Sequence, residues 1–268
     1  MNPISQRKTG REDRKQYLFA IRQLTNREIK RKYARSYLGI IWSVLNPLLT
    51  MLVMTMVFSY MYRRNIVNYP IYYLTGSIFF TFFRTATDSS ISALVDNRAL
   101  LMKVKLPKQT FVIARVYTAL VNFGYTCIAY AFIVILFLLR GKLTLGWSLL
   151  LFPLDVFFSV LFATGIALAL SIGYVFFADI KYLYHVLLTL WMYLSAIFYP
   201  VTSLAPSVQG LIGFNPVYVS ILIARRIVLE GVFPEYTLWI KLVLYSVASL
   251  TLGYWIFRKN ENRVMQHM

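Results

Sequence analysis

The stretch RKYARSYLGIIWSVLNPLL, residues 31–49, joins a dense basic run directly to a long apolar run. Arg31, Lys32 and Arg35 end the charged part, and the apolar part begins at Leu38. A core helix behind a basic loop and a helix that enters a membrane would both begin in this way. The composition of the whole chain separates the two interpretations.

The composition is that of a membrane protein. Of the 268 residues, 59% are hydrophobic and 14% are charged, whereas a soluble domain is about 45–50% apolar and about 25% charged. A net charge of +18 raises the question of nucleic-acid binding. The basic residues lie outside the apolar runs, however, which favours contact with anionic lipid headgroups. The single cysteine, Cys127, excludes a disulfide framework and a cysteine-based metal site.

Six apolar stretches are long enough, or nearly so, for a helix that crosses a bilayer, which takes about 20 residues. The sequence therefore predicts an all-α, polytopic membrane protein with six transmembrane helices. Small residues at four-residue spacing in the fourth stretch, Gly165, Ala169 and Gly173, predict close helix packing. The six stretches are residues 38–60, 70–94, 109–139, 148–178, 184–200 and 236–257.

The distribution of Lys and Arg around the spans predicts the orientation. Nineteen lie on one side: eleven in the first 35 residues, four after the second span, one after the fourth and three in the tail. Six lie on the other side. Both termini are therefore expected in the cytoplasm, so that residues 1–37 and 258–268 are cytoplasmic segments on either side of a transmembrane domain, residues 38–257.

An amphipathic interface helix is expected before the first span, because apolar residues recur at helical spacing within residues 14–35. Thr25-Asn26-Arg27-Glu28 fits a capping box, which predicts that a second helical segment starts there. The alternative to a helix is a disordered basic tail, which we expect for residues 1–12. The apolar residues of the helix are Tyr17, Leu18, Ile21 and Leu24.

Two cytoplasmic loops have features of a docking surface. Residues 96–108, DNRALLMKVKLPK, predict a short helix that Asp96 or Asn97 caps and Pro107 ends. Its apolar stripe fits either the groove of a partner protein or the membrane surface. The second loop, residues 176–185, is tighter and carries one acidic and one basic residue.

The segment 201–235 is apolar but is broken into pieces too short to span a bilayer. Asn215-Pro216 is a strong helix start, with Asn as the cap and Pro at the first helical position, and Gly231 is a helix stop. Two short apolar helices between two spans predict a re-entrant hairpin over about 201–230, which would gate the outer mouth of a pathway. The alternative is a loop that lies in the membrane interface.

The sequence shows no energy source of its own. The nearest match to a phosphate-binding loop, Arg140-Gly141-Lys142, lacks the required earlier glycine. His185 and His267 stand alone in the sequence, so no metal site is expected. Arg84 and Asp88 are four residues apart inside the second span, and we expect them to pair, with a role in either structure or translocation.

Three segments resemble ABC-2 type permeases that export polysaccharides and teichoic acids. Residues 30–49 are similar to the start of the family's first span, a basic run followed by S-x-L-G-x-x-W and a proline. Residues 97–109 resemble the segment after the second span, and residues 195–231 resemble the end of the fifth span and the outer hairpin. The chain departs from the family pattern at Ala178-Asp179, often Arg-Asp, and at Ser195-Ala196, often Thr-Pro or Ser-Pro.

The resemblance implies a homodimer of permeases that works with two separate ATPase subunits, so that ATP and Mg²⁺ bind to the partner and this chain holds no cofactor. The substrate would be a glycan polymer, such as O-antigen or capsular-type polysaccharide, or teichoic acid, on a polyprenyl pyrophosphate lipid that crosses the bacterial cytoplasmic membrane. The alternatives are an ABC-2 permease for a drug or a lipid, and a membrane enzyme or proton-coupled carrier that acts alone.

The resemblance also implies roles for individual residues. The helix 96–106 and the loop 176–184 would contact the ATPases through Asn97, Leu100, Leu101, Lys103, Val104, Asp179 and Lys181. The pathway would run between the protomers along spans one and five, past Tyr37, Trp42, Tyr193, Phe198, Tyr199, Asn215 and Pro216. The aromatic residues among them suit either sugar rings or a membrane-interface belt. Arg31, Lys32 and Arg35 would attract either a pyrophosphate headgroup or anionic lipid.

Overall fold

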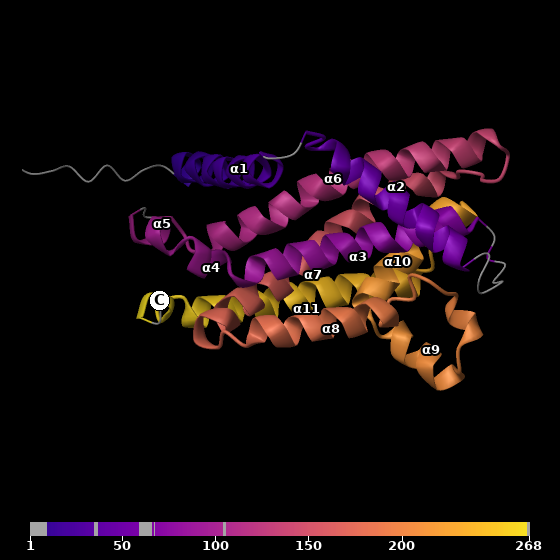
Figure 1. Cartoon of the computed structure of the whole chain (residues 1–268). Coiled ribbons are helices and arrows are strands. Elements are labelled where there is room, and N and C mark those ends of the chain that lie inside the picture. Colours follow the sequence, from indigo (N-terminus) through magenta and orange to yellow (C-terminus); the bar gives the residue numbers. More distant parts are fainter. Residues whose placement is uncertain (1–9, 35–36, 59–65, 67, 104–105, 267–268) are drawn as a thin grey trace, which may run out of the picture.

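The computed structural model describes residues 10–34, 37–58, 66, 68–103 and 106–266, and all regular structure in them is helical (Figure 1). The prediction of an all-α protein is therefore confirmed. Two of the predicted site residues, Arg35 and Val104, lie outside the described residues.

The helices form a bundle with two distinct ends. α4, α5 and the C-terminus lie at one end, which we call the α5 end, and α9 lies at the other, which we call the α9 end (Figure 1). In chain order the elements are α1 (Gly10–Tyr33), α2 (Ile41–Met56), α3 (Tyr69–Ile91), α4 (Ala93–Asp96), α5 (Arg98–Lys103), α6 (Gln109–Leu139), η2 (Trp147–Leu151), α7 (Phe152–Phe176), α8 (Ile180–Leu194), η3 (Val201–Ser203), α9 (Pro206–Gly213), α10 (Pro216–Arg225), η4 (Arg226–Glu230), α11 (Tyr236–Asn260) and η5 (Val264–Gln266).

α1 is one continuous helix, so the predicted helix start at Thr25–Glu28 is wrong. The physical reason is that the two ends of the supposed capping box make tertiary contacts with α6. Thr25 Oγ1 donates to the carbonyl of Ala114 (3.4 Å), and Arg115 pairs with Glu28 (3.0 Å between Nε and Oε1). The helix begins at Gly10, so residues 10–12 are helical, contrary to the expected disordered tail.

The apolar face of α1 packs against the same chain. Ile21 and Leu24 are buried as that face predicts, whereas Leu18 is exposed. α1 lies beside the α5 end of α6 (Figure 1). The interface helix is therefore attached to the bundle by specific contacts in addition to any affinity for lipid.

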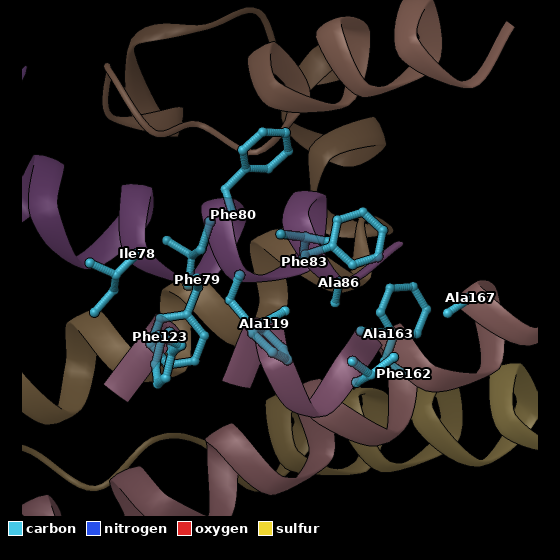
Figure 2. Packing of buried hydrophobic residues seen from close by; sticks show 14 of the residues in the cluster. Ile78, Phe79, Phe80, Phe83, Ala86, Ala119, Phe123, Phe162, Ala163 and Ala167 are labelled. Carbon is cyan, nitrogen blue, oxygen red and sulfur yellow. The ribbon is translucent and has the colours of Figure 1, made fainter. Parts of the chain in front are cut away.

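α3 is the central helix, because it packs against α2, α6, α7, α8 and α10. Pro70 lies in its first turn, where the missing N–H group costs no helical hydrogen bond. Aromatic side chains join α3 to its neighbours. Phe79 meets Phe123 of α6 edge-on with 5.6 Å between ring centroids, and Phe83 stacks on Phe162 of α7 at 5.5 Å (Figure 2). The core of the bundle is built around this apolar side of α3.

α7 and α11 cross at a contact that only small residues allow. A Cβ atom added at Gly253 would lie 2.0 Å from the carbonyl oxygen of Gly165, and one added at Gly165 would lie 2.3 Å from the backbone of Ser249. The prediction of close packing in the fourth span is confirmed at Gly165. Gly173 instead leaves room for the side chain of Ile180 at the start of α8, because a Cβ atom added at Gly173 would lie 2.7 Å from that side chain.

Three helical segments in the described part of the chain are long and apolar enough to cross a membrane: α6, Trp147–Phe176 and α11. The bent pair Pro206–Gly213 and Pro216–Glu230, with 93° between its helices, would make a fourth if it spans as one unit. α2 has 16 residues and α8 has 15, fewer than the roughly 20 that span a bilayer unaided. The predicted count of six spans therefore stays a prediction.

The fifth apolar stretch is not one helix. We expected it over residues 184–200, but α8 begins earlier, at Ile180, and ends at Leu194. The chain then turns through Ala196, whose φ of 47° is in the left-handed region. Hydropathy does not detect this break because the residues of the turn are themselves apolar.

We expect Gly253→Ala to destabilise the protein by about 2 kcal/mol, because overpacking of a close contact costs about 1–3 kcal/mol. This corresponds to a fall of roughly 4–8 °C in Tm, measured by thermal unfolding in detergent. Gly124→Ala in α6 is the matched control, because nothing lies within 4 Å of its added Cβ and alanine is the better helix former. Equal effects of the two variants would contradict the packing assignment.

Candidate functional site

The turn at residues 195–200 is the centre of the α9 end. Ala196 adopts a φ of 47°, which is uncommon for a residue with a Cβ atom. A proline, which the resemblance suggests here, could not adopt this conformation because its ring holds φ near about −65°. The departure from the family pattern at Ser195-Ala196 therefore coincides with a backbone conformation that proline does not permit.

Arg225 of α10 donates hydrogen bonds to the carbonyl groups of this turn. Its Nη2 atom lies 3.0 Å from the oxygen of Ala196 and 3.4 Å from that of Ile197. The guanidinium also stacks on Tyr72, with 3.5 Å between Cζ and the ring centroid. Only 5% of Arg225 is exposed, and no carboxylate of the described residues pairs with it. The positive charge is thus balanced by carbonyl dipoles and an aromatic face.

Tyrosines from the start of α3 satisfy two further carbonyl groups. The hydroxyl of Tyr72 donates to the oxygen of Tyr199 (2.8 Å), and that of Tyr69 donates to the oxygen of Phe198 (3.4 Å). Irregular backbone at membrane depth persists only where protein or water satisfies its polar groups. Side chains of α3 and α10 do so in this turn.

Asn215 joins the start of α10 to the end of α8. Its Oδ1 atom accepts hydrogen bonds from the N–H group of Val217 (3.0 Å) and from Nε1 of Trp191 (2.7 Å). Its Nδ2 atom donates to the carbonyl of Leu194 (3.0 Å) and to Oγ of Ser195 (3.1 Å). The predicted helix start at Asn215-Pro216 is confirmed, and the same amide also caps α8.

An aromatic cluster lies beside the turn. Phe198 stacks on Phe58, at the end of α2, with 5.9 Å between centroids, and it contacts Tyr73 and Tyr193 at 5.9 and 6.2 Å. Tyr193 remains 55% exposed at the edge of the cluster. The structure therefore brings together four of the predicted pathway residues: Tyr193, Phe198, Tyr199 and Asn215.

The other two aromatic residues predicted for the pathway lie elsewhere. Trp42 is near the start of α2, 16 residues before Phe58, which is about 24 Å along a helix axis. Trp42 and Tyr37 are both exposed in the protomer. They do not contribute to the aromatic cluster at the α9 end.

The sequence did not reveal the role of Arg225 because its partners are about 30 and 150 residues away. A signal was nevertheless present. Arg225 lies four residues after Ile221 and three before Val228, both fully buried, which places it on the inner face of α10. Its neighbour Arg226 is instead paired with Glu235 (3.1 Å).

The predicted pair between Arg84 and Asp88 is wrong, because Asp88 contacts a histidine of another helix instead. Nε2 of His185 lies 3.3 Å from Oδ1 of Asp88. α8 crosses α3 at this level, where the hydroxyl of Tyr184 also donates to Oγ1 of Thr87 (2.7 Å). The contact between helices decides the pairing, although the spacing of four residues allows the local one.

At the α5 end, Asn97 joins α1 to the loop after α3. Its Oδ1 atom accepts from Nη2 of Arg27 (2.6 Å), and its Nδ2 atom donates to the carbonyl of Ala93 (2.8 Å). Arg115 adds ion pairs to Glu28 (3.0 Å) and Asp96 (3.1 Å). Burial raises the pKa of the Glu28 carboxyl, and the Arg115 guanidinium opposes this rise. Asn97 therefore holds the loop in place.

The predicted coupling residues divide into two groups by exposure. Asn97 and Leu101 are buried in the protomer and Leu100 is half-buried, so they position α5. Lys103 is exposed on α5. Near the turn between α7 and α8, Asp179 is exposed and Lys181 is half-buried. The large apolar side chains exposed in these two segments are Met102, Phe177, Tyr182 and Leu183.

The predicted headgroup residues Arg31 and Lys32 lie exposed on α1. Together with Glu28, Asp96 and Arg115 they line a polar cavity of 320 Å³. Arg31 and Lys32, together with Arg27, add positive charge to a cavity in which Arg115 is paired with Glu28 and Asp96. The cavity therefore suits an anionic group.

Comparison with known proteins points to one family. The family profile described as ABC-2 type transporter matches residues 20–229. The O-antigen export system permease protein RfbA of Myxococcus xanthus is 32% identical over 189 residues, 70% of this chain and 71% of that protein. A protein of the same name from Klebsiella pneumoniae is 27% identical over 242 residues, 90% of this chain and 91% of that protein. The polysialic acid transport protein KpsM of Escherichia coli is 22% identical over 250 residues, 89% of this chain and 92% of that protein.

We expect Arg225→Lys to destabilise the protein by about 2–3 kcal/mol, because hydrogen bonds to charged groups contribute about 1.5–3 kcal/mol. A lysine ammonium group lacks the planar set of donors that reaches several carbonyl groups, and it does not stack on Tyr72 as a guanidinium does. Thermal unfolding in detergent measures the loss, and chymotrypsin should cleave faster near Phe198. Arg226→Lys is the control, because Arg226 makes a partly exposed ion pair. A larger effect of Arg226→Lys would overturn the role of Arg225.

Proposed function

Because this chain belongs to the ABC-2 type transporter family, we propose that it is the permease subunit of an ATP-driven exporter of a lipid-linked polysaccharide. A member of this family is a transporter subunit and not an enzyme. The observation that carries the proposal is the similarity, over most of the chain, to permeases named for two different glycans, O-antigen and polysialic acid. The cargo is accordingly assigned as a class, a glycan polymer on a polyprenyl pyrophosphate lipid.

The α9 end supports a role as an outer gate. Asn215 and Arg225 tie the hairpin of α9 and α10 to the end of α8, so that these elements move together or must break several buried hydrogen bonds. The aromatic cluster around Phe198 lies against the same turn. Aromatic rings offer flat apolar faces to sugar rings, which suits a passage through which a polymer slides.

The α5 end supports contact with separate ATPase subunits. With Lys and Arg concentrated there, this end faces the cytoplasm of a bacterial inner-membrane protein. Met102 and Lys103 on α5, and Phe177 and Asp179 near the next turn, are exposed where a partner would bind. ATP and Mg²⁺ would bind to that partner, and this chain would contribute the docking helix.

A second copy of the chain would complete the pathway. α2 and α8 both flank α3, and each exposes a row of large apolar side chains away from the bundle. On α8 this row includes Val186, Leu190 and Tyr193, and on α2 it includes Leu52 and Val53. A homodimer that pairs these faces would enclose a passage between the protomers.

The proposed function is tested by reconstitution of the chain with its ATPase in proteoliposomes. Lipid-linked glycan should stimulate ATP hydrolysis and should accumulate on the side opposite the ATPase. Trp42→Ala should reduce export several-fold at normal folded yield, because Trp42 is exposed at the α5 end of α2, where the cargo would enter. Export without an ATPase, or stimulation by a drug but not by glycan, would refute the proposal.

We expect Met102→Asp to weaken co-purification with the ATPase at least tenfold, because it places a charge in an apolar contact on α5. The fold should be unaffected, because 60% of Met102 is exposed. Val208→Asp on α9 is the matched control, since it makes the same kind of change at the opposite end. Unchanged recovery of the ATPase with Met102→Asp would exclude α5 as the docking helix.

A further inference from the structure

One side of α3 carries most of its accessible polar residues, whereas Thr75, Thr87 and Ser90 of the same helix are buried. Ser77, Thr81, Arg84, Thr85 and Asp88 recur at helical spacing and so lie on one side. Of the 23 residues of α3, 15 are buried, and the two exposed ones, Thr81 and Arg84, are both on this side. We call these five residues the α3 polar stripe.

Arg84 has no ion-pair partner in the part of the chain that the structure describes. Among the described residues no carboxylate pairs with it, and Asp88 is engaged by His185 of α8. Arg84 lies seven residues before Ile91, which is about 10 Å from the α5 end of the helix. A charged side chain in the hydrocarbon is costly, so this side of α3 borders water or an anionic group rather than lipid tails.

A groove of 380 Å³ with several polar side chains in its mainly apolar wall opens beside the stripe, between α1, α2, α3 and α6. Thr81 and Thr85 form its α3 wall, and Arg84 directly precedes Thr85 in the sequence. The hydroxyl of Tyr33 and Nζ of Lys32 lie 3.2 and 3.4 Å from Oδ1 of Asn122 in the same groove. Further amide, hydroxyl and indole groups come from Ser43, Asn46, Thr126 and Trp42.

We propose that the α3 polar stripe is a wall of the water-filled passage, and that Arg84 with the adjoining groove binds the phosphate group of a lipid-linked sugar on its way through. This inference rests on the proposed function. The guanidinium of Arg84 matches phosphate oxygens in two-point contacts. The hydroxyl and amide groups of the groove match sugar hydroxyls, and Trp42 offers an aromatic face. Each part of such a ligand thus has a complementary group.

Cysteine accessibility tests the water-filled wall without any transport assay. In a Cys127→Ser background, Thr81→Cys and Thr85→Cys are placed in the full-length chain in proteoliposomes and treated with anionic or cationic methanethiosulfonates. Only a hydrated thiolate reacts, so both should be labelled. Ile128→Cys on the exposed apolar side of α6 is the matched control at mid-helix and should stay unreactive. If all three cysteine variants were equally unreactive toward the methanethiosulfonates, the inference would be overturned.

The charge of Arg84 should control which reagent reacts faster. We expect the anionic reagent to label Thr81→Cys about tenfold faster than the cationic one, because a nearby positive charge concentrates anions. Arg84→Gln should remove this preference and Arg84→Lys should keep it. A preference that persists in Arg84→Gln would show that Arg84 does not face the passage.

The source of the phosphate is tested by protection. Polyprenyl pyrophosphate added to the vesicles should slow labelling of Thr85→Cys several-fold, and Arg84→Gln should abolish this protection. Equal protection by phosphatidylglycerol at the same mole fraction would mean an ordinary lipid site and would overturn the assignment to cargo.

Labelling as expected in a protein that exports no glycan would refute the proposed function alone. Export by a protein whose stripe cysteines never react would refute this inference alone.

Discussion

The hydrogen bonds to the turn after α8 are the constraint on which the α9 end depends. The backbone leaves helical geometry between Leu194 and Pro200, and its carbonyl groups lose their usual partners. Each such group would cost several kcal/mol in hydrocarbon if it stayed unpaired. Arg225, Asn215 and Tyr72 supply the donors from two other helices. α3, α8 and α10 are therefore held in one arrangement by polar contacts rather than by apolar packing alone.

This arrangement determines how the hairpin can move. α10 is bound at its start to the end of α8 through Asn215, and at its end to the turn through Arg225. Ser220 between them also donates to the buried Asp155 of α7 (2.8 Å). An opening motion must therefore either carry the end of α8 along with α10 or exchange these hydrogen bonds for others. α9 has no such ties in the described structure and lies at the edge of the molecule (Figure 1).

The polar groups of the bundle are sorted into separate places. At the α5 end, Arg115 and Asn97 fasten α1 and the loop after α3. At the α9 end, Arg225 closes a turn. Between them, Arg84 lies on the α3 polar stripe, where no carboxylate of the described residues pairs with it. Because Asp88, the other charged residue of α3, contacts His185, Arg84 is the charged group inside α3 that no carboxylate of the described residues pairs with.

The sequence by itself determined the features that depend on neighbouring residues. Apolar length identified a helical membrane protein, the Asn215-Pro216 pair marked a helix start, and the small side chain of Gly165 indicated a close crossing. Tertiary structure alone decided the rest. It kept α1 continuous through Thr25, paired Asp88 with His185 instead of Arg84, and gave the adjacent arginines 225 and 226 different roles. The reason is physical: capping and hydropathy act over a few residues, whereas a buried polar group takes its partner from whichever helix packs against it.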